Sequence, residues 1–227
     1  MAELVSCDEA LPRVVLYGYF RSSAAFRARI ALNLKGIAPE TRYVHLLKDG
    51  GQQHAAEYKA LNPQELIPAL VHDGHTITQS LAIIEYLDEI APEPPLLPAD
   101  PLGRARVRSI AYQIACDIHP LNNLRMLQYL KRTLSQDDAA VAAWQRHWIA
   151  TGFAALEAQL ARDEETGAFC HRDTPTMADV CLIPQMANAR RVELDLAPYP
   201  TLARIEAAAL AHPAFDAALP KNQPDAE

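Results

Sequence analysis

The sequence predicts a small α/β domain followed by an all-helical domain. Up to about residue 90, short β-branched runs alternate with amphipathic segments of helical spacing. Five prolines between Ala91 and Pro101 then interrupt the pattern. Beyond them the apolar residues recur with the helical period. We therefore expect a flexible tail (1–12), the α/β domain (13–91), a proline-rich linker (92–102), the helical domain (103–219) and a second flexible tail (220–227).

The α/β domain begins with a strand–helix–strand unit. Arg13 to Tyr19 is rich in β-branched and aromatic residues, as in a buried strand. A helix is expected next, with apolar residues at every fourth position, and Gly36 suits its end. Thr41 to Leu46 has the composition of a second strand. Because a helix connects them, the two strands are expected to be parallel.

A short helix, a β-hairpin and a longer helix complete this domain. They cover His54 to Leu61, Ile67 to Thr78 with its turn at Asp73-Gly74, and a segment that begins at Gln79. Pro68 opens the first hairpin strand, which indicates an edge position, a bulge or a cis turn. The order of these elements is that of a thioredoxin-like domain.

Helices are expected throughout the second domain. Gly103 to about Leu134 forms one long helical pattern, interrupted at Pro120. Asp137 favours the start of a new helix through the helix dipole. Thr176 and Asp179 have the spacing of a capping box. Two short helices, at about 200–211 and 213–219, are expected to end the domain.

Composition argues against several classes of protein. The 227 residues carry a net charge of -7, whereas sequence-independent nucleic-acid binders need an excess of Lys and Arg. The four cysteines form no C-x-x-C pair and no Cys/His cluster with zinc spacing, so we expect neither a disulfide framework nor a metal. The start lacks a signal peptide, and no apolar run approaches the roughly 18 residues of a membrane span. We expect a cytoplasmic protein that binds no nucleic acid and no membrane.

Thioredoxin-like proteins hold a thiolate at the N-terminus of the first helix. Free amide N–H groups and the helix dipole stabilise the negative charge there. Redox members supply the thiolate from a C-x-x-C motif, but this chain has Ser22-Ser23-Ala24-Ala25 at that place. Disulfide exchange by the chain itself is therefore not expected, but the site could still hold a thiolate that a ligand brings. A serine hydroxyl can donate a hydrogen bond to such a thiolate and lower its pKa, or it can merely cap the helix.

Six segments of the chain carry specific motifs. They are RSSAAFRARIALNLKG (Arg21 to Gly36), KDGGQQ (Lys48 to Gln53), ALNPQELIPAL (Ala60 to Leu70), TQSLAIIEYLDE (Thr78 to Glu89), CDIHPLNNLR (Cys116 to Arg125) and DTPTMADVCLIPQ (Asp173 to Gln185). Together they resemble the zeta-class glutathione transferases, whose best-known members are maleylacetoacetate isomerases. One position departs from the family pattern Ser-Ser-Cys, because Ala24 stands where the cysteine would be.

The resemblance implies roles for ten residues. Ser22 would stabilise the glutathione thiolate, with Ser23 as a second candidate and Arg21 poised over the site. Glutathione would contact Gln53, Ile67, Pro68, Gln79 and Ser80. A dianionic substrate would contact Arg21, Arg125 and Arg191, since paired arginines bind carboxylates. Ordinary roles as helix caps, strand residues or ion-paired arginines are the alternatives. Structural roles are expected for Arg27, Arg29, His119 and Asp179.

The resemblance also implies an enzyme. Glutathione thiolate would add to the cis double bond of maleylacetoacetate, the bond would rotate, and elimination would give fumarylacetoacetate. Three alternatives stay open: a maleylpyruvate isomerase, which Ala24 favours; a transferase or dehalogenase of small α-halo acids; and a silent glutathione-binding module. The KDGGQQ segment favours maleylacetoacetate. The expected partners are glutathione as cofactor, a small unsaturated dicarboxylic keto acid and a second copy of the chain in a homodimer.

Overall fold

A four-stranded mixed sheet organises the first part of the chain. The computed structural model describes residues 13–227, so the expected tail at 1–12 lies outside the described residues. The strands are β1 (Val14–Gly18), β2 (Glu40–Tyr43), β3 (Ala69–His72) and β4 (His75–Thr78), in the order β2-β1-β3-β4. β1 and β2 are parallel, as predicted, and the other pairs are antiparallel. The α/β prediction is therefore confirmed, although β2 ends three residues before Leu46.

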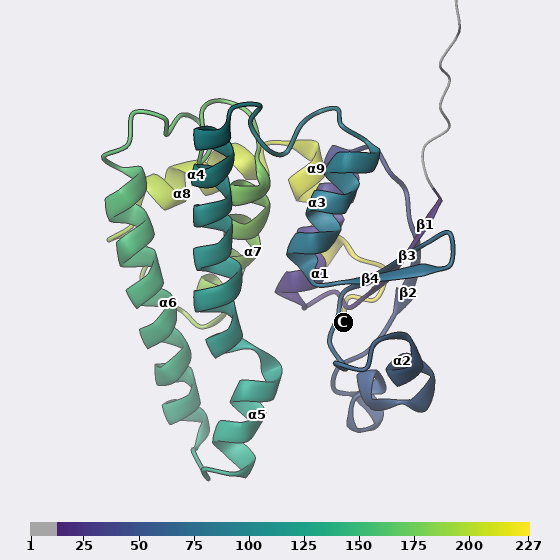
Figure 1. Cartoon of the computed structure of the whole chain (residues 1–227). Helices are drawn as coiled ribbons and strands as arrows, with labels where there is room; N and C mark the ends of the chain where they lie inside the picture. Colours follow the sequence, from purple (N-terminus) through teal and green to yellow (C-terminus); the bar gives the residue numbers. More distant parts are fainter. Residues whose placement is uncertain (1–12) are drawn as a thin grey trace, which may run out of the picture.

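Helices α1 (Ser23–Leu34) and α3 (Ser80–Ile90) pack together beside the sheet (Figure 1). α1 ends where Lys35 and Gly36 follow it, and Gly36 has a φ of 66°, which a residue without a side chain adopts freely. The predicted short helix is split into two parts. A 3₁₀ turn covers Gln52–His54, another precedes it at Lys48–Gly50, and α2 spans Ala56–Leu61.

The hairpin between β3 and β4 turns at Asp73-Gly74, as predicted. Both residues have positive φ angles, 48° and 78°, which suit the two central positions of a tight hairpin turn. β3 lies between β1 and β4, so the edge position considered for Pro68 is wrong. Instead, the Ile67–Pro68 peptide bond is cis, and the strand begins one residue later.

The proline-rich stretch is fixed to the domain that precedes it. The Lys35 ammonium pairs with Asp88 at 2.6 Å and donates to the carbonyl oxygens of Pro92 and Pro94. Asp88 also accepts a hydrogen bond from the Leu96 N–H. The expected linker extended to residue 102, but α4 already begins at Pro101, with Asp100 as its N-cap.

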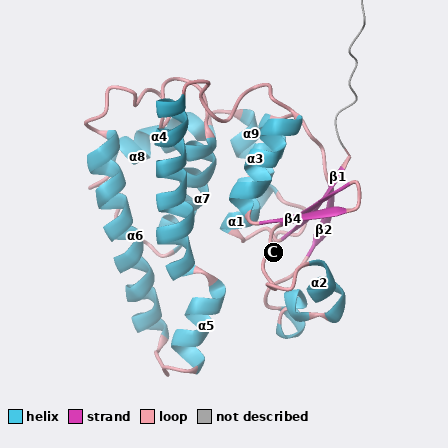
Figure 2. Cartoon of the chain, viewed as in Figure 1, coloured by secondary structure: helices cyan, strands magenta, loops and turns pink. Residues whose placement is uncertain are grey.

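The rest of the chain is helical, as predicted, and contains no strand among its described residues (Figure 2). Its helices are α4 (Pro101–Tyr112), α5 (Leu124–Arg132), α6 (Asp138–Leu160), α7 (Met177–Arg191), α8 (Pro200–Leu210) and α9 (Pro213–Ala217). The interruption expected at Pro120 in the helical pattern over 103–134 is present, although the break begins earlier in the chain. A π-helical turn (Gln113–Ile118) and a 3₁₀ turn (His119–Asn122) separate α4 from α5. None of the described helices is long and apolar enough to cross a membrane.

One apolar core joins the two halves of the molecule. It runs from Leu16 on β1 through Phe26 on α1 to Leu182 on α7, all of them at most 1% exposed. α1 packs directly against α7, and α7 packs against α4. Because α1 belongs to both layers, its N-terminus opens at the junction between the sheet domain and the helical domain (Figure 1).

The π-helical turn approaches α6 at a glycine. The side chain of Ile118 lies so close to Gly152 that a Cβ there would overlap it. Ile118 is 3% exposed and directly precedes His119. Gly152 therefore allows α6 to support the segment that carries His119.

The last residues of the chain are ordered, contrary to the expectation of a second flexible tail. Pro220–Asn222 form a 3₁₀ turn, and Asp225 accepts a hydrogen bond of 2.9 Å from the Phe20 N–H. The Glu227 carboxylate pairs with Lys48. The segment therefore packs beside the loop that leads into α1, and polar contacts fix it where the sequence has no apolar periodicity.

The capping box predicted at Thr176 and Asp179 is present at the start of α7. Asp179 is fully buried, and its carboxylate accepts hydrogen bonds from the Cys170 N–H (2.7 Å) and the Thr176 N–H (2.8 Å). Burial raises the pKa of Asp179, while these hydrogen bonds oppose the shift. The expected structural role of Asp179 agrees with these contacts.

We predict that Asp179→Ala lowers the free energy of unfolding by at least about 2 kcal/mol. The substitution leaves two buried main-chain N–H groups without an acceptor, at about 1–3 kcal/mol each. The matched control is Asp137→Ala, which removes the exposed N-cap of α6 and is expected to cost about 1 kcal/mol. Urea unfolding of both variants measures the difference, and equal losses would contradict the prediction.

Candidate active site

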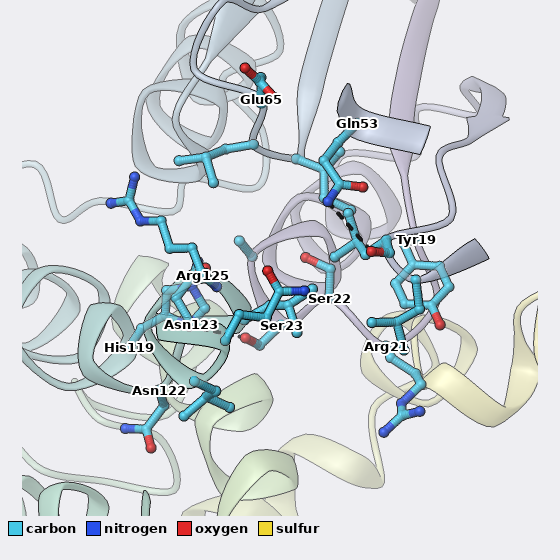
Figure 3. A pocket seen from close by; sticks show the side chains of 18 of the residues that line it. Tyr19, Arg21, Ser22, Ser23, Gln53, Glu65, His119, Asn122, Asn123 and Arg125 are labelled. Carbon is cyan, nitrogen blue, oxygen red and sulfur yellow. Dashed lines mark hydrogen bonds between the residues drawn. The ribbon is translucent and has the colours of Figure 1, made fainter. Parts of the chain in front are cut away.

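The N-terminus of α1 opens into a cavity of about 420 Å³ between the two halves of the molecule. The sheet domain contributes residues around Ser22 and Ser23, the loop that carries Gln53, and the segment before Pro68. The helical domain contributes the 3₁₀ turn with His119, the start of α5 and the end of α7. Figure 3 shows both serines between Arg125 on one side and Arg21 on the other.

Ser22 and Ser23 divide two tasks between them. Ser22 is the N-cap of α1, and its Oγ accepts a hydrogen bond of 3.2 Å from the Ala25 N–H. The capping alternative is therefore correct, but a hydroxyl that accepts through a lone pair keeps its proton for another acceptor. Ser23 is 8% exposed and is hydrogen-bonded through its Oγ to His119 Nδ1 at 3.1 Å. Both serines line the cavity.

His119 belongs to the site, although the sequence indicated a structural role. An edge of its ring faces the cavity opposite Ser23, 96 residues away in the chain (Figure 3). Burial, together with the positive charges of Arg27, Arg191 and Arg125, lowers the pKa of His119 well below its usual range. The ring is therefore neutral at neutral pH, with one nitrogen that donates and one that accepts.

A second cavity, of about 200 Å³, adjoins the first and is lined by Pro68, Gln79 and Ser80. Ile67 and Arg125 line both cavities, so the two form one continuous site. Gln79 has a positive φ of 71° and precedes α3, which has no side-chain N-cap. The N–H groups of the first turn of α3 therefore remain available to an anion.

Two groups on the sheet domain lack partners of their own. The Ile67 main chain makes no hydrogen bond to another residue within 13–227, although Ile67 directly precedes β3. The Nε2 of the buried Gln53 side chain is hydrogen-bonded to His54 Nε2 at 3.0 Å and to the Leu46 carbonyl oxygen at 3.4 Å, whereas its Oε1 has no partner among the described residues. An extended peptide bound along the cavity would satisfy both groups.

Three arginines face the larger cavity, and none of them has a carboxylate partner within 13–227. Arg21, Arg125 and Arg191 line it from the loop before α1, from α5 and from the last position of α7. The thirteen ion pairs among the described residues include none of them. Burial and the charge of Arg21 lower the pKa of Arg191. The ion-paired alternative therefore does not apply to these residues, and the cavity has a positive potential that suits a dianion.

All ten residues singled out in the sequence line these two cavities. Ala24 lines both of them, so the missing family cysteine is a missing side chain of the site itself. Sequence reasoning gave His119 a structural role and assigned none to Asn122 and Asn123, although the CDIHPLNNLR segment contains all three. These residues share the family segment that also contains Arg125, and this shared segment could have indicated that they belong to the site.

Comparisons with known proteins agree with this geometry. Residues 16–95 match the family described as glutathione S-transferase, N-terminal domain. The chain is 51% identical to a probable maleylacetoacetate isomerase of Vibrio cholerae, over 94% of this chain and 98% of that protein.

Two solved structures resemble the whole chain. The holo structure of a maleylpyruvate isomerase, described as a bacterial zeta-class glutathione S-transferase, has a TM-score of 0.91 and 48% identity and covers 94% of this chain and 100% of its own. The maleylacetoacetate isomerase of Methylobacterium extorquens AM1, with bound malonate and glutathione, has a TM-score of 0.90 and 43% identity, covering 94% and 99%. The chain belongs to the zeta class of glutathione transferases, the enzyme family of the maleylacetoacetate isomerases.

Proposed function

We propose that the protein catalyses the glutathione-dependent cis–trans isomerisation of maleylacetoacetate to fumarylacetoacetate. The observation that carries the proposal is the presence of a capped helix N-terminus and three arginines without carboxylate partners around one cavity. The first suits a thiolate and the second a dicarboxylate. Family membership over nearly the whole chain supports the same activity.

When bound, glutathione supplies the thiolate that adds to the cis double bond and leaves again after the bond has rotated. The Ser22 hydroxyl donates to this sulfur, and the N-terminus of α1 adds the field of its dipole. Ser23 and the neutral His119 form the hydrogen-bonded wall beside it. The Ile67 main chain and Gln53 hold the extended tripeptide, and Gln79 and Ser80 hold its γ-glutamyl end.

Arginines orient the substrate and stabilise the charge that develops on its oxygen. Arg125 and Arg191 bind the carboxylates from the helical domain. Arg21, directly before Ser22, lines the same cavity and would contribute positive charge that stabilises an enolate oxygen. A relative that binds malonate together with glutathione supports a site for dicarboxylates.

Maleylpyruvate is the second candidate substrate, because it requires the same chemistry. Ala24 favours it, since the family resemblance implies that maleylpyruvate isomerases also lack a cysteine in that segment. A maleylpyruvate isomerase is also among the similar structures, with a TM-score of 0.91.

The proposed working form is a homodimer in the cytoplasm. Leu102 and Tyr112, at the two ends of α4, are 84% and 42% exposed in the single chain. Such exposed apolar side chains support an interface along this helix, where a second copy of the chain would cover them. Sedimentation equilibrium tests the assembly, since a dimer has twice the chain mass of 25.0 kDa. A mass of one chain at micromolar concentration would contradict it.

A side-by-side assay tests the proposed reaction. We expect isomerisation of both maleylacetoacetate and maleylpyruvate, with turnover that requires glutathione and returns it unconsumed. Total glutathione is measured at the end of the reaction. Stoichiometric loss would indicate a transferase or dehalogenase instead, and a lack of turnover despite glutathione binding would indicate a silent binding module.

We predict that Ser22→Ala lowers turnover about tenfold or more, because loss of a hydrogen bond to a thiolate of roughly 1.5–3 kcal/mol raises the thiol pKa by about one unit or more. Ser22→Thr keeps a hydroxyl and is the matched control, with turnover expected near that of the parent protein. Ultraviolet titration of the bound thiol measures its pKa directly. An unaltered rate and pKa in Ser22→Ala would remove this residue from its proposed role.

We predict that replacing Arg125 or Arg191 with Met raises KM for the dianionic substrate by roughly tenfold or more, with a smaller change in kcat. Each loses a charge-assisted hydrogen bond of about 1.5–3 kcal/mol. Arg132→Met is the control, since this exposed arginine of α5 lines neither cavity. Steady-state kinetics decide the outcome, and equal KM values for all three variants would contradict carboxylate binding.

A further inference from the structure

A third cavity, of about 360 Å³, opens from the larger one and has no role in the reaction outlined above. We call it the side cavity. It shares Arg21, Ser23, Asn188 and Arg191 with the larger cavity, so the two are continuous at this wall. The residues that line only the side cavity are Phe20, Phe26, Pro184, Ala187, Pro220 and Glu227. The site therefore has space beyond its arginines that no step of the reaction uses.

The side cavity is largely apolar beyond the shared wall. Phe20 and Phe26 are 7% and 1% exposed, and Pro184 is buried within α7. Ala187 lies one turn before Arg191 on the same helix and contributes only a methyl group to the wall. Because apolar surface gains free energy when it leaves water, such a wall favours an apolar ligand over a polar one.

Among the described residues that line only the side cavity, Glu227 alone is charged. Its carboxylate pairs with Lys48, and this contact lowers the pKa of Glu227, so the group is ionised at neutral pH. A carboxylate already paired in this way does not need a cationic ligand, and its negative charge disfavours a second anion nearby. The charge of the side cavity therefore also favours a neutral ligand.

The C-terminal segment supplies one wall of the side cavity and is fixed by contacts of its own. Asp225 accepts a hydrogen bond of 2.9 Å from the Phe20 N–H, and Gln223 Nε2 donates to the Leu219 carbonyl oxygen at 2.9 Å. Pro220, which lines the cavity, lies in the chain between these anchors. The side cavity is therefore a defined part of the fold.

The arginines determine which part of an acceptor can enter the side cavity. Arg125 lines the larger cavity but not the side cavity. Figure 3 shows it across the two serines from Arg21. With one carboxylate at Arg125 and the double bond beside the thiolate at Ser22, the other end of the acceptor points to the shared wall. A dianion ends there with its second carboxylate at Arg191, whereas an apolar chain continues into the side cavity.

We propose that the protein also isomerises cis-4,6-dioxo-2-alkenoates whose far end is an unbranched apolar chain, and that this chain occupies the side cavity. The thiolate adds to the double bond, and the electron pair moves to the conjugated carbonyl oxygen. After rotation the pair returns, the trans double bond forms and the thiolate leaves, so no oxidant or second reactant is consumed. This inference rests on the proposed function and extends it from dianions to monocarboxylates.

Steady-state kinetics with two monocarboxylates test the inference. One is cis-4,6-dioxo-2-heptenoate, which ends in a methyl group, and the other is cis-4,6-dioxo-2-undecenoate, which is four methylenes longer. The parent protein is expected to convert the longer acid with a kcat/KM at least about tenfold higher, because each fully buried methylene contributes up to about a factor of four.

Ala187→Leu fills the side cavity and is expected to remove most of this preference. It should lower kcat/KM for the longer acid about tenfold and change that for the shorter acid less than about threefold. Ala143→Leu is the matched control, since this exposed alanine of α6 lines none of the three cavities, and it is expected to keep the preference.

Two measurements separate the loss of the side cavity from a general loss of structure. Calorimetry with glutathione is expected to give the same affinity for both variants as for the parent protein, and circular dichroism checks that they are folded. Should Ala187→Leu fail to fold, Ala187→Val provides the second arm, and it is expected to reduce the preference at least about threefold.

The outcomes distinguish this inference from the proposed function. If the parent protein converts neither the two monocarboxylates nor maleylacetoacetate, the proposed isomerase activity fails. If it converts maleylacetoacetate but does not prefer the longer monocarboxylate, only the inference about the side cavity fails. Retention of the full preference by a folded Ala187→Leu variant, or an equal loss of activity on both monocarboxylates, would also overturn it.

Discussion

The packing of α1 between the sheet domain and α7 is the constraint on which the site depends. One apolar core runs through this contact, so the two halves cannot separate without exposing it. As a result, the N-terminus of α1 has a fixed position relative to the helices that carry Arg125 and Arg191. A fixed helix N-terminus, with its free N–H groups and positive dipole end, can stabilise a thiolate that a ligand supplies.

Charge is arranged around this helix in two layers. Arg21, Arg125 and Arg191 line the open cavity, while Arg27 lies behind the adjoining one. Some other arginines of the chain are ion-paired, as Arg106 is with Asp163 and Arg108 with Glu85. The site thus gathers several arginines that have no carboxylate partner among the described residues, although the net charge of the chain is -7. Such focusing attracts small dianions to the site while the rest of the surface repels them.

Local chemistry explains which features the sequence could predict. The hairpin follows from Asp73-Gly74 and the capping box from the spacing of Thr176 and Asp179, because few residues fulfil these tasks. Pro120 marked an interruption between α4 and α5, but the π-helical turn before it could not be predicted, since the helical period continues through Gln113–Ile118. The ordered C-terminus and the pairing of Ser23 with His119 depend on contacts between distant segments. The arginines were found through the family pattern, since nothing local distinguishes an arginine that lines a cavity from one in water.

Gly152 shows that the residues which shape this site extend beyond its walls. It lines neither cavity, yet a Cβ there would overlap the side chain of Ile118, which directly precedes His119. Directed evolution of substrate preference should therefore include position 152, which a library restricted to residues that line the cavities would omit. The same holds for natural sequence change, because a methyl group at position 152 would require the Ile118 side chain to move, next to the histidine that pairs with Ser23.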